Sequence, residues 1–188
     1  THILPVGEDP PEWSPPAEIV SAMQGADLIV INGATFEGWI ATVTLPEGKV
    51  LDTTAGIADQ LIETQETTHS HGKDGEHTHA GTDPHTWSDP TIAAIQADAI
   101  RAKLSEIDPA RAETYQANYD GLKTELDELD AAYKAAIGDA DHPKFATSHP
   151  AFNYMARRYG LQMLNYGFEP DTVPDGHDLH HFEDAIKT

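Results

Sequence analysis

The N-terminal part of the chain alternates between helical and strand-like apolar patterns. Residues 15–25 (PPAEIVSAMQG) place their apolar side chains at helical spacing between a proline and a glycine. Residues 28–31 (LIVI) form a short continuous apolar run, which is typical of a buried parallel strand. Residues 49–54 (KVLDTT) predict another short strand. Helix followed by strand, repeated along the chain, indicates α/β layering.

Two Asp-Pro pairs predict the starts of two further helices. Asp89 and Asp108 each precede a proline, so each is expected to cap a helix that has proline at its first position. The second helix is predicted to be long, over residues 108–138, or about 45 Å at 1.5 Å per residue. Its apolar positions recur at intervals of four and three residues: Tyr115, Tyr119, Leu122, Leu126, Leu129 and Tyr133. Gly138 is expected to end it.

A new β-α-β pattern begins after this long helix. KFATSHP and LQMLNY are strand-like, and PAFNYMARRYG between them is helical. The long helix is therefore predicted to be a spine between two lobes. The predicted division is an N-terminal α/β lobe over 1–107 with a histidine-rich loop at 67–82, a connecting helix over 108–138, and a C-terminal lobe over 139–188 that is only begun.

The charge and the cysteine content narrow the classes of function. The chain has 32 acidic and 11 basic side chains, and its formal charge is −21. Such a charge repels phosphate backbones and anionic lipid surfaces, so we expect no nucleic-acid binding. It suits a protein that handles cations, and it equally suits a protein from a salty habitat. The absence of cysteine excludes disulfides and thiolate zinc sites, and no apolar run approaches the length of a membrane span.

Histidine is concentrated in one polar, glycine-rich stretch. Five of the 11 histidines fall in residues 68–87: His69, His71, His77, His79 and His85. Neutral imidazole is the commonest protein ligand for Zn²⁺ and also suits Cu²⁺ and Ni²⁺. The glycines of the stretch would let it wrap around an ion, whereas the simpler interpretation is a solvated polar tract. The spacing matches neither a zinc finger nor the HExxH helix of a metalloprotease.

Two histidines stand at positions where α/β proteins collect ligands. His85 lies in DPHTWSDP, four residues before Asp89, and His149 lies at the boundary between a predicted strand and a predicted helix. Ligand sites of open α/β sheets gather at the carboxyl ends of strands. Each histidine taken alone is equally compatible with a structural role.

Taken together, these features resemble the zinc- and manganese-binding solute-binding proteins of bacterial ABC importers. The resemblance rests on ADLIVING, the histidine-rich loop, DPHTWSDP, the long helix and SHPAFNYMARRYGL. It implies an α/β fold of two Rossmann-like lobes joined by one spine helix, with the ion held between the lobes. His85 and His149 then fall on two of the family's three histidine ligands, and the histidine-rich loop falls on the insertion found in zinc-specific members.

The sequence departs from that family in two places. Pro11 stands where the first histidine ligand is expected, and the carboxylate ligand of the second lobe would lie beyond residue 188. We expect His79 or His77 of the histidine-rich loop to fill the place left by Pro11, with Glu12 as the simpler alternative. His69 and His71 are further candidates. Histidines 177, 180 and 181 are expected in a loop and a helix start rather than in the main site.

The resemblance predicts extracytoplasmic capture of Zn²⁺ and its delivery to an ABC permease, without catalysis. The protein is expected to be a periplasmic or extracellular monomer, either free or attached to the membrane as a lipoprotein. Two alternatives remain at this point. One is a metal-buffering or metallochaperone protein that acts through the histidine-rich loop. The other is a zinc-dependent hydrolase, for which Glu76 or Glu12 would have to act as general base.

Overall fold

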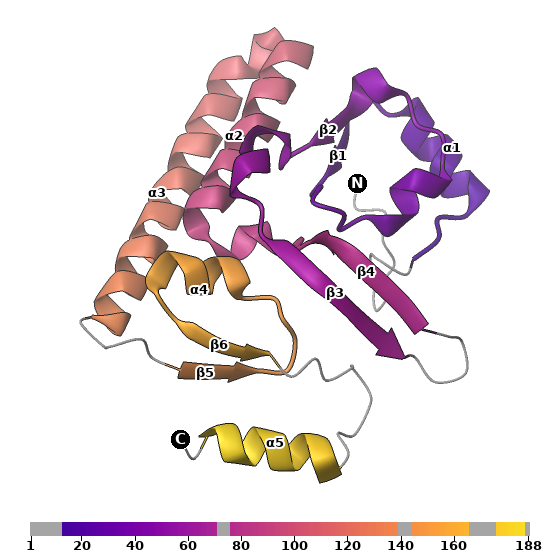
Figure 1. The fold of residues 1–188 in the computed structure, drawn as a ribbon. Helices are drawn as coiled ribbons and strands as arrows, with labels where there is room; N and C mark the ends of the chain where they lie inside the picture. The colour runs from indigo at the N-terminus through magenta and orange to yellow at the C-terminus, as the bar shows by residue number, and fades with distance from the viewer. Residues whose placement is uncertain (1–12, 71–75, 139–143, 166–175, 187–188) are drawn as a thin grey trace.

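The computed structural model describes residues 13–70, 76–138, 144–165 and 176–186 (Figure 1). Short helices and strands alternate at both ends of the chain, and two long helices lie between them. The elements are α1 (Ala17–Gly25), β1 (Ile29–Ile31), β2 (Val50–Asp52), β3 (Glu63–Ser70), β4 (Glu76–Thr82), α2 (Pro90–Ile107), α3 (Ala112–Ile137), β5 (Lys144–Thr147), α4 (Asn153–Tyr159), β6 (Gln162–Asn165) and α5 (Gly176–Ile186). No helix in these ranges is long and apolar enough to cross a membrane.

Parallel strand pairs stand before and after the long helices. β1 pairs with β2, with Ile29 opposite Val50, and β5 pairs with β6, with Lys144 opposite Gln162. The strands predicted at 28–31 and 49–54 and the later β-α-β unit are therefore confirmed. The α/β class could be predicted because the apolar runs are too short to be buried helices. The exact division into lobes stays a prediction.

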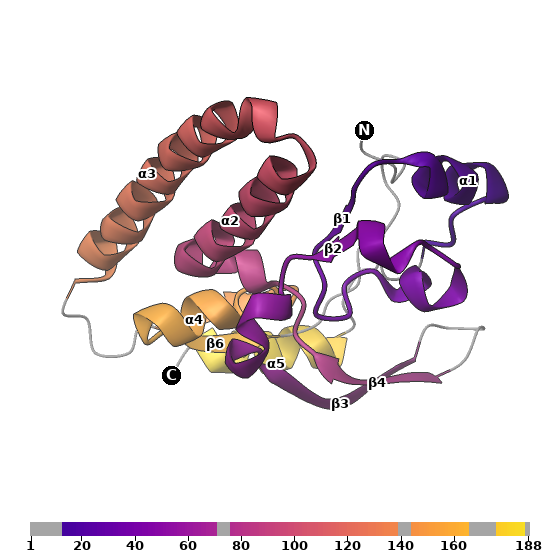
Figure 2. The same ribbon diagram turned by 90° about the horizontal axis from the view of Figure 1, so that it is seen from above.

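The histidine-rich segment is not the loop that its composition predicted. β3 and β4 form an antiparallel hairpin, in which His69 lies opposite His77 and Thr67 lies opposite His79. The β-branched threonines of both strands favour extended backbone, and this preference outweighs the polar character of the segment. The hairpin extends away from α2 and α3 (Figures 1 and 2).

The long helix ends where the sequence predicted. α3 runs alongside α2 and reaches α4 near its C-terminal end (Figure 2). It closes at Gly138, which has a φ of +57° and donates its backbone N–H to the carbonyl of Lys134. Asp89 caps α2 as expected, since its carboxylate accepts the backbone N–H of Thr91 at 2.8 Å. Asp108 makes no such cap bond and instead pairs with Arg111 at 2.6 Å.

Two apolar clusters hold the elements together. One contains Trp13, Met23, Ile29 and Trp39, with the two indole rings edge to face at 5.6 Å. The other contains Ile57 and Ile92 from the part of the chain before α3 and Tyr154 from α4. Because Tyr154 is fully buried among residues that precede α3, the β-α-β unit that follows the long helix packs firmly onto the first part of the chain.

A cluster of charged side chains joins α2, α3 and α4 at the N-terminal end of α2. Arg158 of α4 donates to Asp130 of α3 at 2.7 Å and lies 3.4 Å from Asp89, the cap of α2. Lys134 and Tyr159 also contact the Asp130 carboxylate, at 2.7 and 3.0 Å. The hydrogen bond from Arg158 holds the pKa of Asp130 well below its usual range. Burial and the same carboxylate raise the pKa of Tyr159 to about 12.

We predict that Asp130→Asn lowers the free energy of unfolding near neutral pH by about 1–2 kcal/mol, because it weakens charged hydrogen bonds to a carboxylate that is only 13% exposed. Because the folded-state pKa is depressed, this contribution is complete above the unfolded-state value of about 3.9 and is lost as pH falls further. Urea unfolding of both proteins should therefore show a difference that shrinks below about pH 4.

Asp127→Asn is the matched control for this measurement. Asp127 lies one turn earlier on α3 and forms an exposed ion pair with Lys123 at 2.6 Å. An exposed pair contributes little to stability, so this variant should unfold close to the parent. Equal losses in the two variants would show that the cluster around Asp130 has no special role.

Candidate metal centre

The position of His85 is fixed by a turn at the end of the hairpin. The buried Asp83 follows β4, and its carboxylate accepts the backbone N–H of His85 at 2.9 Å. The same oxygen lies 2.8 Å from Nδ1 of the His85 ring. Ser88 closes the following turn by donating to the carbonyl of His85 at 2.9 Å. Backbone and ring are therefore both held by one carboxylate.

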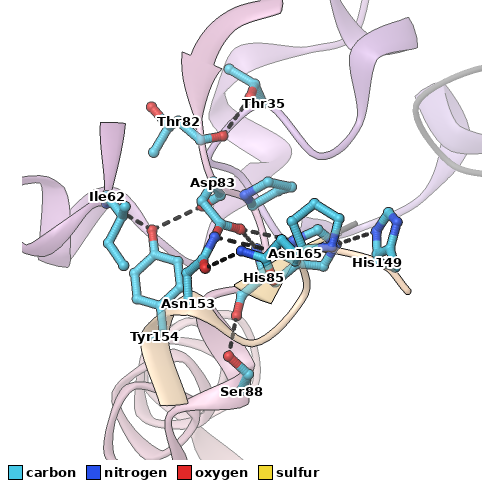
Figure 3. A network of polar contacts seen from close by, with 12 residues as sticks. Thr35, Ile62, Thr82, Asp83, His85, Ser88, His149, Asn153, Tyr154 and Asn165 are labelled. Carbon is cyan, nitrogen blue, oxygen red and sulfur yellow. Dashed lines mark hydrogen bonds and ion pairs between the residues drawn. The ribbon is translucent and has the colours of Figure 1, made fainter. Parts of the chain in front are cut away.

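The second carboxylate oxygen of Asp83 accepts a hydrogen bond from a residue that follows α3 in the sequence. Asn153 of α4 donates to it at 2.8 Å, and the hydroxyl of Tyr154 donates to the backbone carbonyl of Asp83 at 2.8 Å (Figure 3). Burial by itself would raise the pKa of Asp83. The hydrogen bonds from His85 and Asn153 outweigh it, so the pKa is lower than usual, and the carboxylate is ionised at neutral pH.

His149 lies in the junction between β5 and α4, and its ring faces the ring of His85. Its Nε2 atom lies 3.2 Å from Nε2 of His85, and the two rings are nearly perpendicular at 83° (Figure 3). The structure thus brings together two predicted ligands that are 64 residues apart in sequence. Both follow a strand, as expected for a ligand site in an α/β protein.

The hydrogen-bond pattern determines which ring nitrogen of His85 is available. An ionised carboxylate can only accept, so Nδ1 of His85 must carry the proton, and Nε2 keeps its lone pair. Two nitrogen ligands at 2.0–2.1 Å from a tetrahedral Zn²⁺ lie about 3.3 Å apart. The separation of 3.2 Å between the two Nε2 atoms is close to that edge.

An aromatic wall flanks the histidine pair. Phe36 packs edge to face on Trp87 at 5.1 Å, and Trp87 lies 5.5 Å from the His85 ring. The wall is only partly closed, because Trp87 is 43% exposed. Of the other aromatic residues in the two histidine motifs, Tyr154 is buried in the core and Phe152 is exposed.

The loop that presents Phe36 is tightly constrained. The Glu37 carboxylate accepts the backbone N–H groups of the first two residues of the loop 32–37, at 2.8 and 3.1 Å. Burial raises the pKa of this carboxyl group, although these hydrogen bonds oppose it. Ala34 and Thr35 both have positive φ, 50° and 66°, a conformation that is uncommon for residues other than glycine. The constraint holds Phe36 against His85.

The remaining predicted ligands lie outside the described contacts. Glu12 and His71 fall outside the described residues. His69, His77 and His79 are part of the hairpin, His69 in β3 and the other two in β4. Within the described residues, no group of three or more histidine or acidic side chains is arranged around one point. Among the described side chains, the predicted ligands that the structure brings together are therefore His85 and His149.

Three residues of the site were missed by sequence reasoning. Asp83 and Asn153 lie inside the motifs DPHTWSDP and SHPAFNYMARRYGL, and Phe36 follows the first strand. An aspartate side chain often accepts a hydrogen bond from the backbone two residues further along. This tendency could have identified Asp83, which stands two residues before His85. Nothing local in the sequence pairs Asn153 with Asp83, because that contact depends on the packing of α4.

The chain is similar in sequence to proteins of bacterial zinc uptake. The family model of the zinc-uptake complex component A, periplasmic (ZnuA), matches residues 1–188. The zinc-binding lipoprotein AdcA of Streptococcus pneumoniae R6 is 33% identical over 192 residues, which cover 98% of this chain and 38% of that protein. The high-affinity zinc uptake system protein ZnuA of Bacillus subtilis 168 is 31% identical over 182 residues, which cover 94% and 57%.

Solved structures agree with the expected fold. The metal-dependent lipoprotein YcdH from Bacillus subtilis superimposes with a TM-score of 0.78 at 27% identity, over 98% of this chain and 65% of that one. The Zn(II)-bound ZnuA-like domain of Streptococcus pneumoniae AdcA gives 0.75 at 27% identity with the same coverage. The α/β fold expected from the resemblance is confirmed. The chain spans about two fifths to three fifths of the length of these curated relatives.

We predict that Asp83→Asn weakens metal binding by about 10- to 100-fold, the range typical of a residue that orients a metal ligand. The neutral amide no longer requires a proton on Nδ1 of His85, so the ring loses its fixed orientation. A competition titration with a chelator of known affinity measures the change. Asp98→Asn, which removes an exposed partner of Arg101, is the control. Unchanged affinity in a folded Asp83→Asn variant would contradict the orienting role.

Proposed function

This chain belongs to the family of periplasmic zinc-uptake components, and we propose that it captures Zn²⁺ outside the cytoplasm and passes it to an ABC permease. The observation that carries this proposal is the pair of Nε2 atoms 3.2 Å apart, with one ring already oriented by a carboxylate. A free ion is the cargo, so no reaction is catalysed. The protein acts as a monomer, free or attached to the membrane as a lipoprotein.

Nitrogen ligation favours zinc over manganese at this site. Imidazole suits Zn²⁺, whereas Mn²⁺ prefers carboxylate, carbonyl and water oxygens. The Asp83 carboxylate contacts the pair, but its two oxygens are occupied by His85 and Asn153. It therefore tunes and orients a ligand instead of binding the ion itself.

The third ligand is proposed to come from the hairpin, through His79 or His77, with Glu12 as the competitor. His79 lies four residues before Asp83 in the extended strand β4, a separation of about 13 Å. The hairpin must therefore bend toward the site to contribute a ligand. Gly81, the residue of β4 without a side chain, is where such a bend costs least.

His85→Ala and His149→Ala should each weaken zinc binding. The loss of affinity should exceed the roughly 10- to 100-fold that is typical when a residue that only orients a ligand is replaced. Affinity in the parent should also fall as pH drops through about 6.5, because imidazole must be deprotonated to ligate. Calorimetric titration with Zn²⁺, and with Mn²⁺ in competition, tests both points. Equal or tighter binding of Mn²⁺, or equal zinc affinity at pH 5.5 and 7.5, would contradict the proposal.

Replacing both His77 and His79 with alanine separates the two candidates for the third ligand. If the hairpin supplies the ligand, the double variant loses zinc affinity by several orders of magnitude and Glu12→Ala changes it little. The reverse pattern assigns the ligand to Glu12. If the double variant keeps the affinity of the parent, the hairpin has no role in the main site. That result would not contradict the proposal that His85 and His149 bind the ion.

A further inference from the structure

α5 is an amphipathic helix with an unusual polar face. Its apolar residues Leu179, Phe182 and Ile186 recur at intervals of three and four, so they share one face of the helix. At about 100° per residue, the opposite face contains four metal-binding residue types within about 100° of arc. These are His177, His180, His181 and Asp184, and we name them the histidine face of α5.

Two members of this face are in contact. Nε2 of His180 lies 3.5 Å from a carboxylate oxygen of Asp184, one turn further along. His177 and His181 have the same spacing of four residues in the helical backbone. Side chains at this spacing are neighbours on a helix, and two histidines so placed can bind one zinc ion, as in the HExxH helix. The register of α5 thus supports two adjacent pairs of ligands.

The composition of the chain does not explain this face. A solvated helix face in a chain of charge −21 is expected to be acidic, and α3 fits that expectation, since its 26 residues include Glu113, Asp120, Glu125, Asp127 and Glu128 and no histidine. In α5, three of the four positions opposite the apolar face are imidazoles. The His180 and Asp184 side chains are 70% and 60% exposed, so a hydrated ion can reach them.

We propose that the histidine face of α5 is a second site for a divalent transition-metal ion, separate from the pair His85–His149. Imidazole nitrogens and one carboxylate suit Zn²⁺, Ni²⁺ and Cu²⁺, and water completes the coordination shell. α5 lies beyond β5 and β6 as the last described element (Figure 1). The exposure of His180 and Asp184 makes this site weaker and faster in exchange than the pair His85–His149, in which the buried Asp83 holds one ring.

A full-length variant without the other metal-binding histidines isolates the site. Alanine at positions 69, 71, 77, 79, 85 and 149 leaves five of the 11 histidines, namely His2, His142 and the three of α5. Isothermal titration with Ni²⁺ and with Zn²⁺ then measures what remains. Because His85 and His149 are absent from this background, the result does not depend on the proposed function.

We expect this background to bind one equivalent of either ion. His177→Ala with His181→Ala should weaken binding at least tenfold, and His2→Ala with His142→Ala, which removes the same number of imidazoles, should leave it unchanged. In the background protein, Zn²⁺ should also slow amide hydrogen exchange in residues 176–186, because the ion joins adjacent helical turns. The proposal is wrong if the background binds no ion, if the two double variants behave alike, or if exchange in α5 does not respond.

Discussion

The buried carboxylate of Asp83 is the group on which the arrangement of the histidine pair depends. One oxygen holds the backbone and the ring of His85, and the other accepts from Asn153, which belongs to the part of the chain after α3. A buried carboxylate is tolerated only when its oxygens are hydrogen bonded. The requirement to satisfy Asp83 therefore fixes the position of α4 relative to the end of the hairpin. Since His149 immediately precedes α4, the same requirement sets its distance from His85.

Two further contacts make this junction rigid. Tyr154 is buried beside Ile57 and Ile92, and its hydroxyl binds both the carbonyl of Asp83 and the N–H of Ile62. Arg158 ties α4 to α3 and to the cap of α2. Under the proposed function, the protein must nevertheless release the ion. If His85 and His149 are the two ligands held by packed elements, the adjustable part of the coordination is the third ligand, which we propose comes from the hairpin. Release then requires only that this ligand move, and the rest of the junction can stay intact.

Local signals predicted most of the elements but not the contacts between them. The cap at Asp89, the end of α3 at Gly138 and the strands at 28–31 and 49–54 were readable because capping, glycine geometry and apolar runs act over a few residues. The histidine-rich segment was predicted as a loop because its glycines and charges suggested one. Strand pairing between β3 and β4 overrode that preference. The partnership of Asp83 with Asn153 spans 70 residues, and only the packing of α4 creates it.

Charge and ligand geometry have different roles in such a protein. A net charge of −21 attracts every divalent cation through the same long-range field, so it raises the local concentration of cations without selecting among them. Selection must come from short-range ligation. The pair His85–His149 has one ring oriented by a buried carboxylate and flanked by aromatic rings, whereas His180 and Asp184 of α5 stand largely in solvent. Ligands fixed before the ion arrives lose less conformational entropy on binding. In the proposed function, the buried network around Asp83 is therefore the feature that distinguishes the pair His85–His149 from an exposed set of similar residues.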